Sequence, residues 1–204
     1  MCRNICVQHA RSVEATHILF LDPDMVPDAY IQDDPQAKPF WHVAWPFMKA
    51  NPGCVLAAPY CGRRPHEPVH CFARNKENNL VRITRDQAAL LEGWYAVDAV
   101  GTGMMLIDMA VFDRFEHPIF RDVFQDKTCT KLRQSQDVDF CLRCHAAKVP
   151  VYVNFSCWAD HWQNSPVRRP GWKAETPPDE PVSLAVNPSV PVLQVVGQGD
   201  KSWQ

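Results

Sequence analysis

The sequence has no excess of charge of either sign. Lysine and arginine together number 21, aspartate and glutamate number 23, and the formal net charge is −2. A balance so close to zero excludes a global electrostatic field that would hold the chain on nucleic acid or on an anionic membrane. It still leaves room for a local basic patch.

Long apolar runs and internal repeats are also absent. The first thirty residues contain no uninterrupted apolar core of signal-peptide length, and no later run approaches the roughly 20 apolar residues that a spanning helix needs. With 204 residues, of which 46% are hydrophobic, the chain is long enough to bury one sizeable core. We therefore expect a soluble protein with one compact domain and no membrane span.

The nine cysteines lack the dense, regular spacing of a small disulfide-rich secreted domain. This pattern favours free thiols in a reducing compartment, and the cytoplasm is the expected location. Cys141, Cys144 and His145 have the spacing of a c-type haem attachment site, but they fall in a predicted amphipathic helix, which favours buried thiols. A zinc site is a further alternative, although the spacings match no strong template. Its candidate ligands are Cys54, Cys61 and Cys71 with His66 or His70.

Apolar runs alternate with helix-compatible segments along most of the chain, which predicts an α/β fold with a sheet flanked by helices. The expected strands cover residues 16–21, 55–60, 80–84, 95–100, 104–107 and 149–155. The expected helices cover 3–15, 40–50 and 110–115, and another begins near Gln136 with Ser135 as its N-cap. Residues 61–79 are polar and predict a long loop or hairpin.

The composition of the sequence changes after residue 162. Residues 163–204 contain seven prolines and no sustained periodicity. We therefore expect a domain over residues 1–162 and an extended, Pro-rich tail over residues 163–204.

Two carboxylates directly follow the first predicted strand, in the triplet Asp22-Pro23-Asp24. Open α/β sheets bind their ligands at the ends of such strands. Magnesium and manganese prefer hard oxygen ligands of this kind, so the triplet is a candidate metal site. Taken alone it is a weak signal, because surface turns also favour aspartate and proline.

Further segments follow the acids in a definite order, and the order is more specific than any one piece. The segments are Ile-Leu-Phe-Leu-Asp-Pro-Asp-Met-Val-Pro at 18–27, Gly-Thr-Gly-Met-Met-Leu-Ile at 101–107 with Val111-Phe112, Ser-Gln-Asp-Val-Asp-Phe-Cys-Leu-Arg at 135–143, Val-Tyr-Val-Asn at 151–154, and His161. In this order the sequence resembles the GT-A glycosyltransferases, particularly the large family-two group, over residues 16–162. Arg3-Asn4 also resembles the start of this region in one subgroup.

The resemblance implies a Rossmann-like GT-A fold and a role for each matching residue. Asp24, with Asp22 directly or through water, would hold Mn²⁺ or Mg²⁺ on the diphosphate of a nucleoside diphosphate sugar. His161 would complete the metal site, with a packed core histidine as the alternative. Asp137, in the first turn of its helix, would be the general base of an inverting transfer.

The segment from Gly101 through Thr102 to Gly103 would line the donor sugar or the acceptor, with a strand bulge as the alternative. Gln136, which stands where the family usually has glutamate, would bind substrate next to the retained Asp137. Trp94 could stack on a sugar ring or belong to the core. Asp139 and Arg143, four residues apart on the same helix, favour a structural ion pair.

The chain begins too late to include the β-α units that hold the nucleotide base and ribose in such enzymes. Three explanations are open: a partner subunit supplies this half, the gene product is truncated, or the base is held in an unusual way. The acceptor is undetermined: glycan, protein, lipid and modified nucleic acid all remain. Two other functions stay open, a nucleotidyltransferase acting on sugar phosphates and a catalytically inactive sugar-binding or scaffold module.

Overall fold

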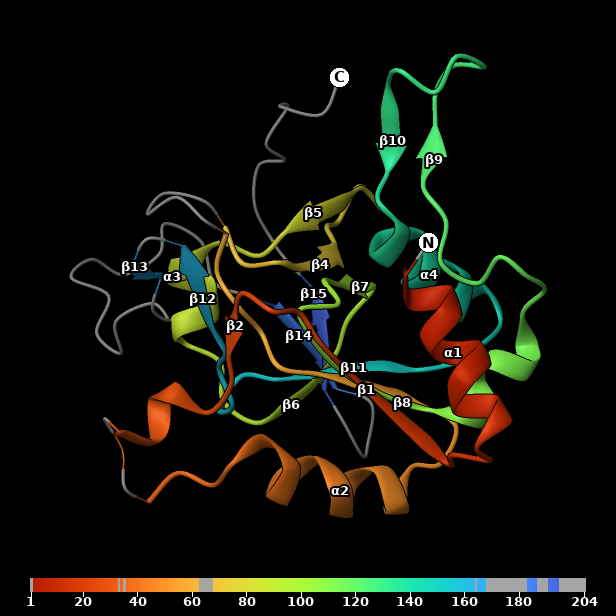
Figure 1. The fold of residues 1–204 in the computed structure, drawn as a ribbon. Coiled ribbons are helices and arrows are strands. Elements are labelled where there is room, and N and C mark those ends of the chain that lie inside the picture. Colours follow the sequence, from red (N-terminus) through yellow and green to blue (C-terminus); the bar gives the residue numbers. More distant parts are fainter. Residues whose placement is uncertain are drawn as a thin grey trace.

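The computed structural model describes residues 2–32, 34, 36–62, 68–163, 165–167, 183–186 and 191–194, the last three segments and residue 163 as backbone only. Its centre is a seven-stranded mixed sheet with the order β1-β8-β3-β11-β6-β15-β14 (Figure 1). These strands are β1 (His17–Leu21), β3 (Val55–Ala57), β6 (Trp94–Ala96), β8 (Met104–Asp108), β11 (Val151–Asn154), β14 (Ser183–Val186) and β15 (Pro191–Gln194). The predicted α/β class, with a mixed sheet and helices, is confirmed.

Three strands of the sheet run in one direction and place their carboxyl ends at the same edge. β3 and β11 are parallel, and β8 lies antiparallel between β1 and β3. The segment that leads into β8 therefore starts at the edge where β1, β3 and β11 end. All three residues of β3 and the first four of β8 are buried, as expected for inner strands covered on both faces.

Helices cover both faces of this sheet (Figure 1). On one face lies α2 (Phe40–Ala50), where Phe47 contacts the rings of Trp94 in β6 and Tyr152 in β11. On the other face lie α1 (Cys2–Ser12) and α4 (Gln136–Ala146), where Phe20 of β1 packs through Phe120 onto Phe140 of α4. The apolar side chains of the sheet are thus divided between two layers.

Smaller sheets and short helices surround the main sheet. One small sheet joins β2 (Met25–Val26), β12 (Asp160–Gln163) and β13 (Ser165–Val167), another joins β4 (Cys71–Arg74), β5 (Leu80–Arg82) and β7 (Ala99–Val100), and a hairpin joins β9 (Val123–Phe124) and β10 (Leu132–Gln134). The short helices are η1 (Ala29–Gln32), α3 (Arg85–Ala89) and η2 (Met109–Arg114). The predicted loop or hairpin over 61–79 includes β4, which pairs with β5.

Two predicted elements differ in the structure. The strand expected over 95–100 is divided: β6 belongs to the main sheet and β7 to a small one. The reason is Asp98 between them, whose carboxylate accepts hydrogen bonds from the backbone and side chain of Arg74 and turns the chain toward β4. The expected tail supplies β14 and β15, and β15 pairs in parallel with β6, so this part of the chain extends the sheet. The division into a domain and a tail at residue 162 stays a prediction.

All nine cysteines are free thiols, and six of them are buried. Cys141 and Cys144, of the haem-like spacing, are fully buried in α4, and the Cys141 thiol lies 3.6 Å from the carbonyl oxygen of Val100. This confirms the interpretation of these two residues as core thiols. Among the described residues, no helix is long and apolar enough to cross a bilayer.

The burial of the thiols can be tested by chemical labelling. We expect a thiol reagent to modify the exposed Cys2 and Cys129 quickly and the half-buried Cys6 more slowly, leaving the other six protected until the protein unfolds. Stopped-flow labelling with and without denaturant tests this. Fast modification of Cys141 or Cys144 in the native protein would contradict the packing of α4.

The same thiols predict a loss of stability in alkali. Burial raises the pKa of Cys54 and Cys141 from 9.0 to about 12, and that of Cys61 to about 11. Between pH 9 and these values the unfolded chain has lost the protons that the folded chain keeps, so the free energy of unfolding falls as the pH rises. Denaturant titrations at a series of pH values should show this decline beginning near pH 9, and replacing Cys141 with alanine should make it shallower.

Candidate functional site

The carboxyl edge of the sheet brings together segments that are far apart in sequence. The backbone N–H of Asp22, just after β1, donates to the carbonyl of Gly103 at 2.9 Å. After β3, the carbonyl of Pro59 accepts a hydrogen bond from Ala159 at 3.1 Å, which ties the approach to β12 to the same edge. Three predicted site segments, at 22–24, at 101–103 and around 161, therefore meet there.

Asp24 and His161 form the closest contact between predicted site residues. The Nε2 atom of His161 lies 3.0 Å from Oδ2 of Asp24. Strand pairing fixes this contact, because β2 and β12 are antiparallel with His161 opposite Met25, and the N–H of Trp162 donates to the carbonyl of Asp24 at 2.6 Å. The Asp24 side chain is 32% exposed and that of His161 is 7% exposed, so the pair opens to solvent on the carboxylate side.

Asp22 has a different partner. Its two carboxylate oxygens accept hydrogen bonds from Nη2 of Arg3 at 2.7 and 2.9 Å. The neighbouring Asn4 fixes the start of α1, because its side chain exchanges two hydrogen bonds with the backbone of Phe120. This part of the site thus carries a cation together with the carboxylate, and direct binding of a metal by Asp22 stays a prediction.

Tyr60 fills the space above both glycines of the Gly101-Thr102-Gly103 segment. A Cβ added at Gly101 would lie 1.9 Å from the Tyr60 hydroxyl oxygen, and one added at Gly103 would lie 2.7 Å from Cε1 of the same ring. Neither glycine has a positive φ. The glycines are therefore required here by the close packing of Tyr60, and contact of this segment with a sugar stays a prediction.

The hydroxyl of Tyr60 interacts electrostatically with charged groups of the candidate site. Burial raises the pKa of Tyr60 well above its usual value; the carboxylates of Asp137 and Asp22 raise it further, while the N–H of Gly103 and the cation of Arg3 oppose them. The phenol thus stays protonated at neutral pH and can donate a hydrogen bond between the two groups of acids. Its ring stacks on His70 and meets His161 edge-on, with ring centroids 4.9 and 5.6 Å away.

Sequence reasoning did not identify Tyr60 or Arg3 as site residues. Arg3 had a weak signal in its resemblance to a subgroup of the family. Tyr60 had none, since it belongs to no motif and its place depends on the alignment of β3 with β8.

Asp137 occupies the first turn of α4 and is half-buried. Its Oδ1 atom accepts hydrogen bonds from the hydroxyl of Ser135 and from the backbone N–H of Val138. Ser135 is the N-cap as predicted, although its hydroxyl bonds the Asp137 side chain and caps no backbone N–H. These contacts leave the direction of the carboxylate well defined, with Oδ1 held by the helix terminus.

Gln136 begins α4, and its backbone N–H donates to the carboxylate of Asp122 at 3.0 Å. Asp139, two residues further on, is buried and accepts hydrogen bonds from Arg143 at 2.8 Å and from Arg121 at 3.1 Å. The predicted ion pair between Asp139 and Arg143 is confirmed. The two acids of this turn are therefore in different environments, one facing the site and one neutralised within the fold.

Trp94 begins β6 on the α2 side of the sheet. Its half-buried ring stacks on Phe47 with ring centroids 4.4 Å apart. This is the core packing that the sequence left open as the alternative, and stacking of Trp94 on a sugar stays a prediction.

Within the described ranges, no three His, Cys, Asp or Glu side chains lie close enough to hold a metal ion by themselves. This applies to Cys54, Cys61, Cys71 and His70 of the alternative zinc site, while His66 lies outside the described residues. Asp24 and His161 together offer one carboxylate oxygen and one imidazole nitrogen.

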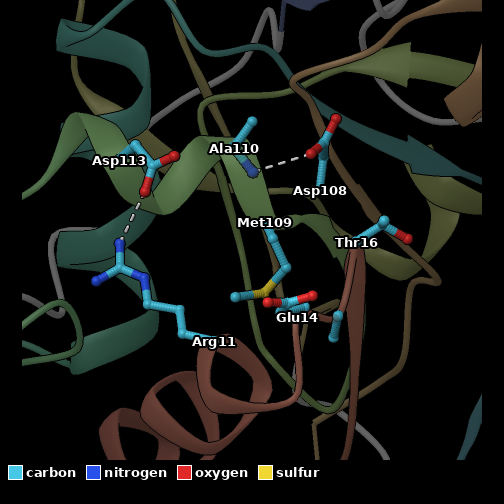
Figure 2. Close-up of a pocket in the computed structure, with 8 residues that line it drawn as sticks. Arg11, Glu14, Thr16, Asp108, Met109, Ala110 and Asp113 are labelled. Atoms are coloured by element: carbon cyan, nitrogen blue, oxygen red, sulfur yellow. Dashed lines mark hydrogen bonds and ion pairs between the residues drawn. The ribbon is translucent and has the colours of Figure 1, made fainter.

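A pocket lies at the opposite end of β1, beside Thr16, and is lined by acids and by Arg11 (Figure 2). Its polar groups serve the fold. Arg11 pairs with Asp113 at 3.0 Å, and the Asp108 carboxylate accepts hydrogen bonds from the backbone of Ala110 at 2.9 Å and of Gly53 at 2.7 Å. The pocket therefore does not belong to the candidate site.

Comparison with known proteins gives a likeness of fold. No family model matches the sequence, and no curated protein matches it significantly. A solved structure does match: the crystal structure of A197 from STIV, at 15% sequence identity over 98% of this chain and 78% of that chain, with a TM-score of 0.51. The chain shares the fold of that protein. At this identity the likeness carries no statement about activity.

The packing of Tyr60 on the glycines gives a prediction with an internal control. Gly101→Ala should destabilise the protein by roughly 1–3 kcal/mol, because the new methyl group overlaps the Tyr60 hydroxyl. Adding Tyr60→Phe should recover part of this loss. Gly103→Ala meets ring carbons, so the same second substitution should recover little there. Denaturant unfolding of the two double-mutant cycles measures the coupling, and equal coupling at both glycines would contradict the assignment.

Proposed function

We propose that this chain is a GT-A type glycosyltransferase domain that transfers a sugar from a nucleoside diphosphate donor, assisted by Mn²⁺ or Mg²⁺. The observation that carries the proposal is the contact between Asp24 and His161, two residues whose pairing as metal ligands the family resemblance implies and whose side-chain atoms lie 3.0 Å apart. The α/β fold and the position at the carboxyl edge of the sheet support it.

The surroundings of the His161 ring can accommodate a cation beside Nε2. Nδ1 lies 3.2 Å from the carbonyl oxygen of Cys61, and Nε2 faces the Asp24 carboxylate. A neutral imidazole has one N–H, so it can donate to only one of these two oxygen acceptors. With the proton on Nδ1, directed at Cys61, the lone pair of Nε2 points toward Asp24, the arrangement of a metal-binding histidine whose other nitrogen is held by a carbonyl.

The donor set fits a divalent ion that keeps part of its coordination for a substrate. Asp24 supplies oxygen and His161 supplies nitrogen, and phosphate oxygens and water complete such sites when the protein provides few ligands. When bound, the metal would neutralise charge on the diphosphate leaving group. The cation of Arg3, held by Asp22, lies at the same site and would bind phosphate oxygens.

The remaining groups suit proton transfer from an acceptor hydroxyl. The Asp137 carboxylate is held in place by hydrogen bonds from the Ser135 hydroxyl and from the backbone N–H of Val138 in the first turn of α4. In this role Asp137 would accept the proton of the acceptor hydroxyl, and the buried Tyr60, which stays protonated, would support the glycine segment beside it. One base acting on the acceptor corresponds to transfer with inversion.

A donor screen tests the proposal. UDP, GDP, CDP and TDP sugars are incubated with the full chain and manganese, and release of the nucleoside diphosphate is measured. The proposal predicts metal-dependent release from at least one donor, abolished by a chelator. Release of pyrophosphate from a nucleoside triphosphate and a sugar phosphate would indicate the nucleotidyltransferase instead, and failure to bind any nucleoside diphosphate with manganese would favour an inactive binding module.

A further inference from the structure

β1 lies at one end of the main sheet, and among the described residues it pairs with β8 alone. Its sequence, His-Ile-Leu-Phe-Leu, contains neither a proline nor a lysine, arginine or acid. Such an apolar run is typical of a strand that is buried on both faces. Exposed edge strands usually carry a lysine, a proline or a bulge that prevents further pairing. The structure thus places a strand with the composition of an inner strand at the end of the sheet.

The backbone hydrogen bonds of β1 show which of its residues face outward. On either side of the strand, Thr16 and Asp22 are bonded through the backbone to the residues opposite them, at 3.0 and 2.9 Å. Because this bonding alternates in an antiparallel pair, the even-numbered residues of β1 bond to β8. The odd-numbered ones direct their N–H and C=O groups to the open side, and these are His17, Leu19 and Leu21. Within the described part of the chain, no backbone hydrogen bond reaches these outward groups.

The side chains of the same three residues share one face of the sheet, because side chains alternate along a strand. On this face Leu19 and Leu21 are 44% and 46% exposed. The face is the one that α2 covers, since the ring of Trp45 meets His17 edge-on with centroids 5.0 Å apart. Trp45 in turn stacks on Trp41, which is 46% exposed. Exposed apolar side chains of β1 and α2 therefore adjoin the open side of the strand.

We propose that β1 pairs with β1 of a second copy of this chain, antiparallel to it and related by a two-fold axis at Leu19. The outward N–H and C=O groups favour a strand as the occupant, because another strand supplies donors and acceptors at the same spacing. They favour an identical strand because His17 and Leu21 lie symmetrically about Leu19. A single two-fold axis therefore pairs every outward donor with an outward acceptor.

This arrangement also covers the exposed side chains. Leu19 lies opposite Leu19 of the second copy, and Leu21 lies opposite its His17, on the face where Trp45 packs. Cross-strand apolar contacts of this kind stabilise a pair of strands. The two main sheets become continuous, and β1, whose carboxyl end leads to Asp22 and Asp24, becomes an inner strand.

The test combines analytical ultracentrifugation with residue-resolved amide exchange of the full chain. The parent should sediment as a dimer. Leu19→Lys places two lysines opposite each other at the axis and should give a monomer, because like charges directly opposite destabilise a strand pair. In the parental dimer the amides of residues 17, 19 and 21 should exchange slowly, and in the variant they should exchange fast. The amides of residues 18, 20 and 22 bond to β8 and should stay protected in both, which also shows that the variant is folded.

Leu90→Lys is the matched control, since Leu90 is 55% exposed and lies outside β1 and α2. It adds the same charge and should remain a dimer. Leu21→Lys is a second interface variant, should Leu19→Lys fail to fold, and it should also be monomeric. A parent that sediments as a monomer at the concentration used for exchange would overturn the proposal, as would a dimer that survives the interface variants. Fast exchange of residues 17, 19 and 21 within a parental dimer would do the same, because the copies would then associate through another surface.

Discussion

Replacing Asp24 with alanine is expected to weaken manganese-dependent binding of the nucleoside diphosphate by about 100-fold or more, while the fold is retained. The Asp24 side chain is partly exposed, so its loss should remove the proposed ligand and half of the pair with His161 without leaving a closed cavity. Titration calorimetry with the nucleoside diphosphate, in manganese and in chelator, measures the effect.

A matched surface acid provides the control for this variant. Asp113 is 75% exposed and pairs with Arg11 at 3.0 Å, at the opposite end of β1. Asp113→Ala removes the same charge and should bind as the parent does. If Asp24→Ala keeps the manganese-dependent affinity, the proposed metal site is wrong, whatever the enzyme activity of the parent.

Most of the sheet could be predicted from the sequence because its inner strands are short, continuous apolar runs bounded by turns. β8, predicted over 104–107, is observed as Met104–Asp108, and α2 has the predicted bounds, 40–50. The break in the strand expected over 95–100 could not be predicted. It depends on the hydrogen bonds between Asp98 and Arg74, which are 24 residues apart.

The candidate site was predictable only where a motif marks it. Asp24 and His161 could be paired in advance through the resemblance, and the pairing of β2 with β12 brings them together. Tyr60 shows the limit of such reasoning. The glycines at 101 and 103 have the appearance of a ligand-binding segment, but the ring that occupies the space above them comes from the segment after β3, more than forty residues earlier, and nothing local indicates that contact.

Substituting Asp137 and Asp139 in turn separates an effect on catalysis from an effect on stability. The two residues lie two positions apart in one helix but have different environments. Asp137→Asn should reduce sugar transfer by roughly 100-fold or more, because it removes the proposed general base, and should leave donor and metal binding intact. Its melting temperature should change little, because the half-buried carboxylate accepts its described hydrogen bonds from neighbours in its own turn, Ser135 and Val138.

Asp139→Asn should do the reverse. The buried Asp139 carboxylate balances Arg121 and Arg143, so its loss leaves two arginines without their partner and should cost about 2–4 kcal/mol of unfolding free energy. The transfer rate of the fraction that remains folded should stay close to that of the parent. Thermal unfolding and transfer rate measured on both variants give opposite patterns if Asp137 is the base. A rate near the parental value in Asp137→Asn would point to another base or to a retaining mechanism, whereas equal losses of rate in both variants would mean that the helix as a whole, and not one carboxylate, supports catalysis.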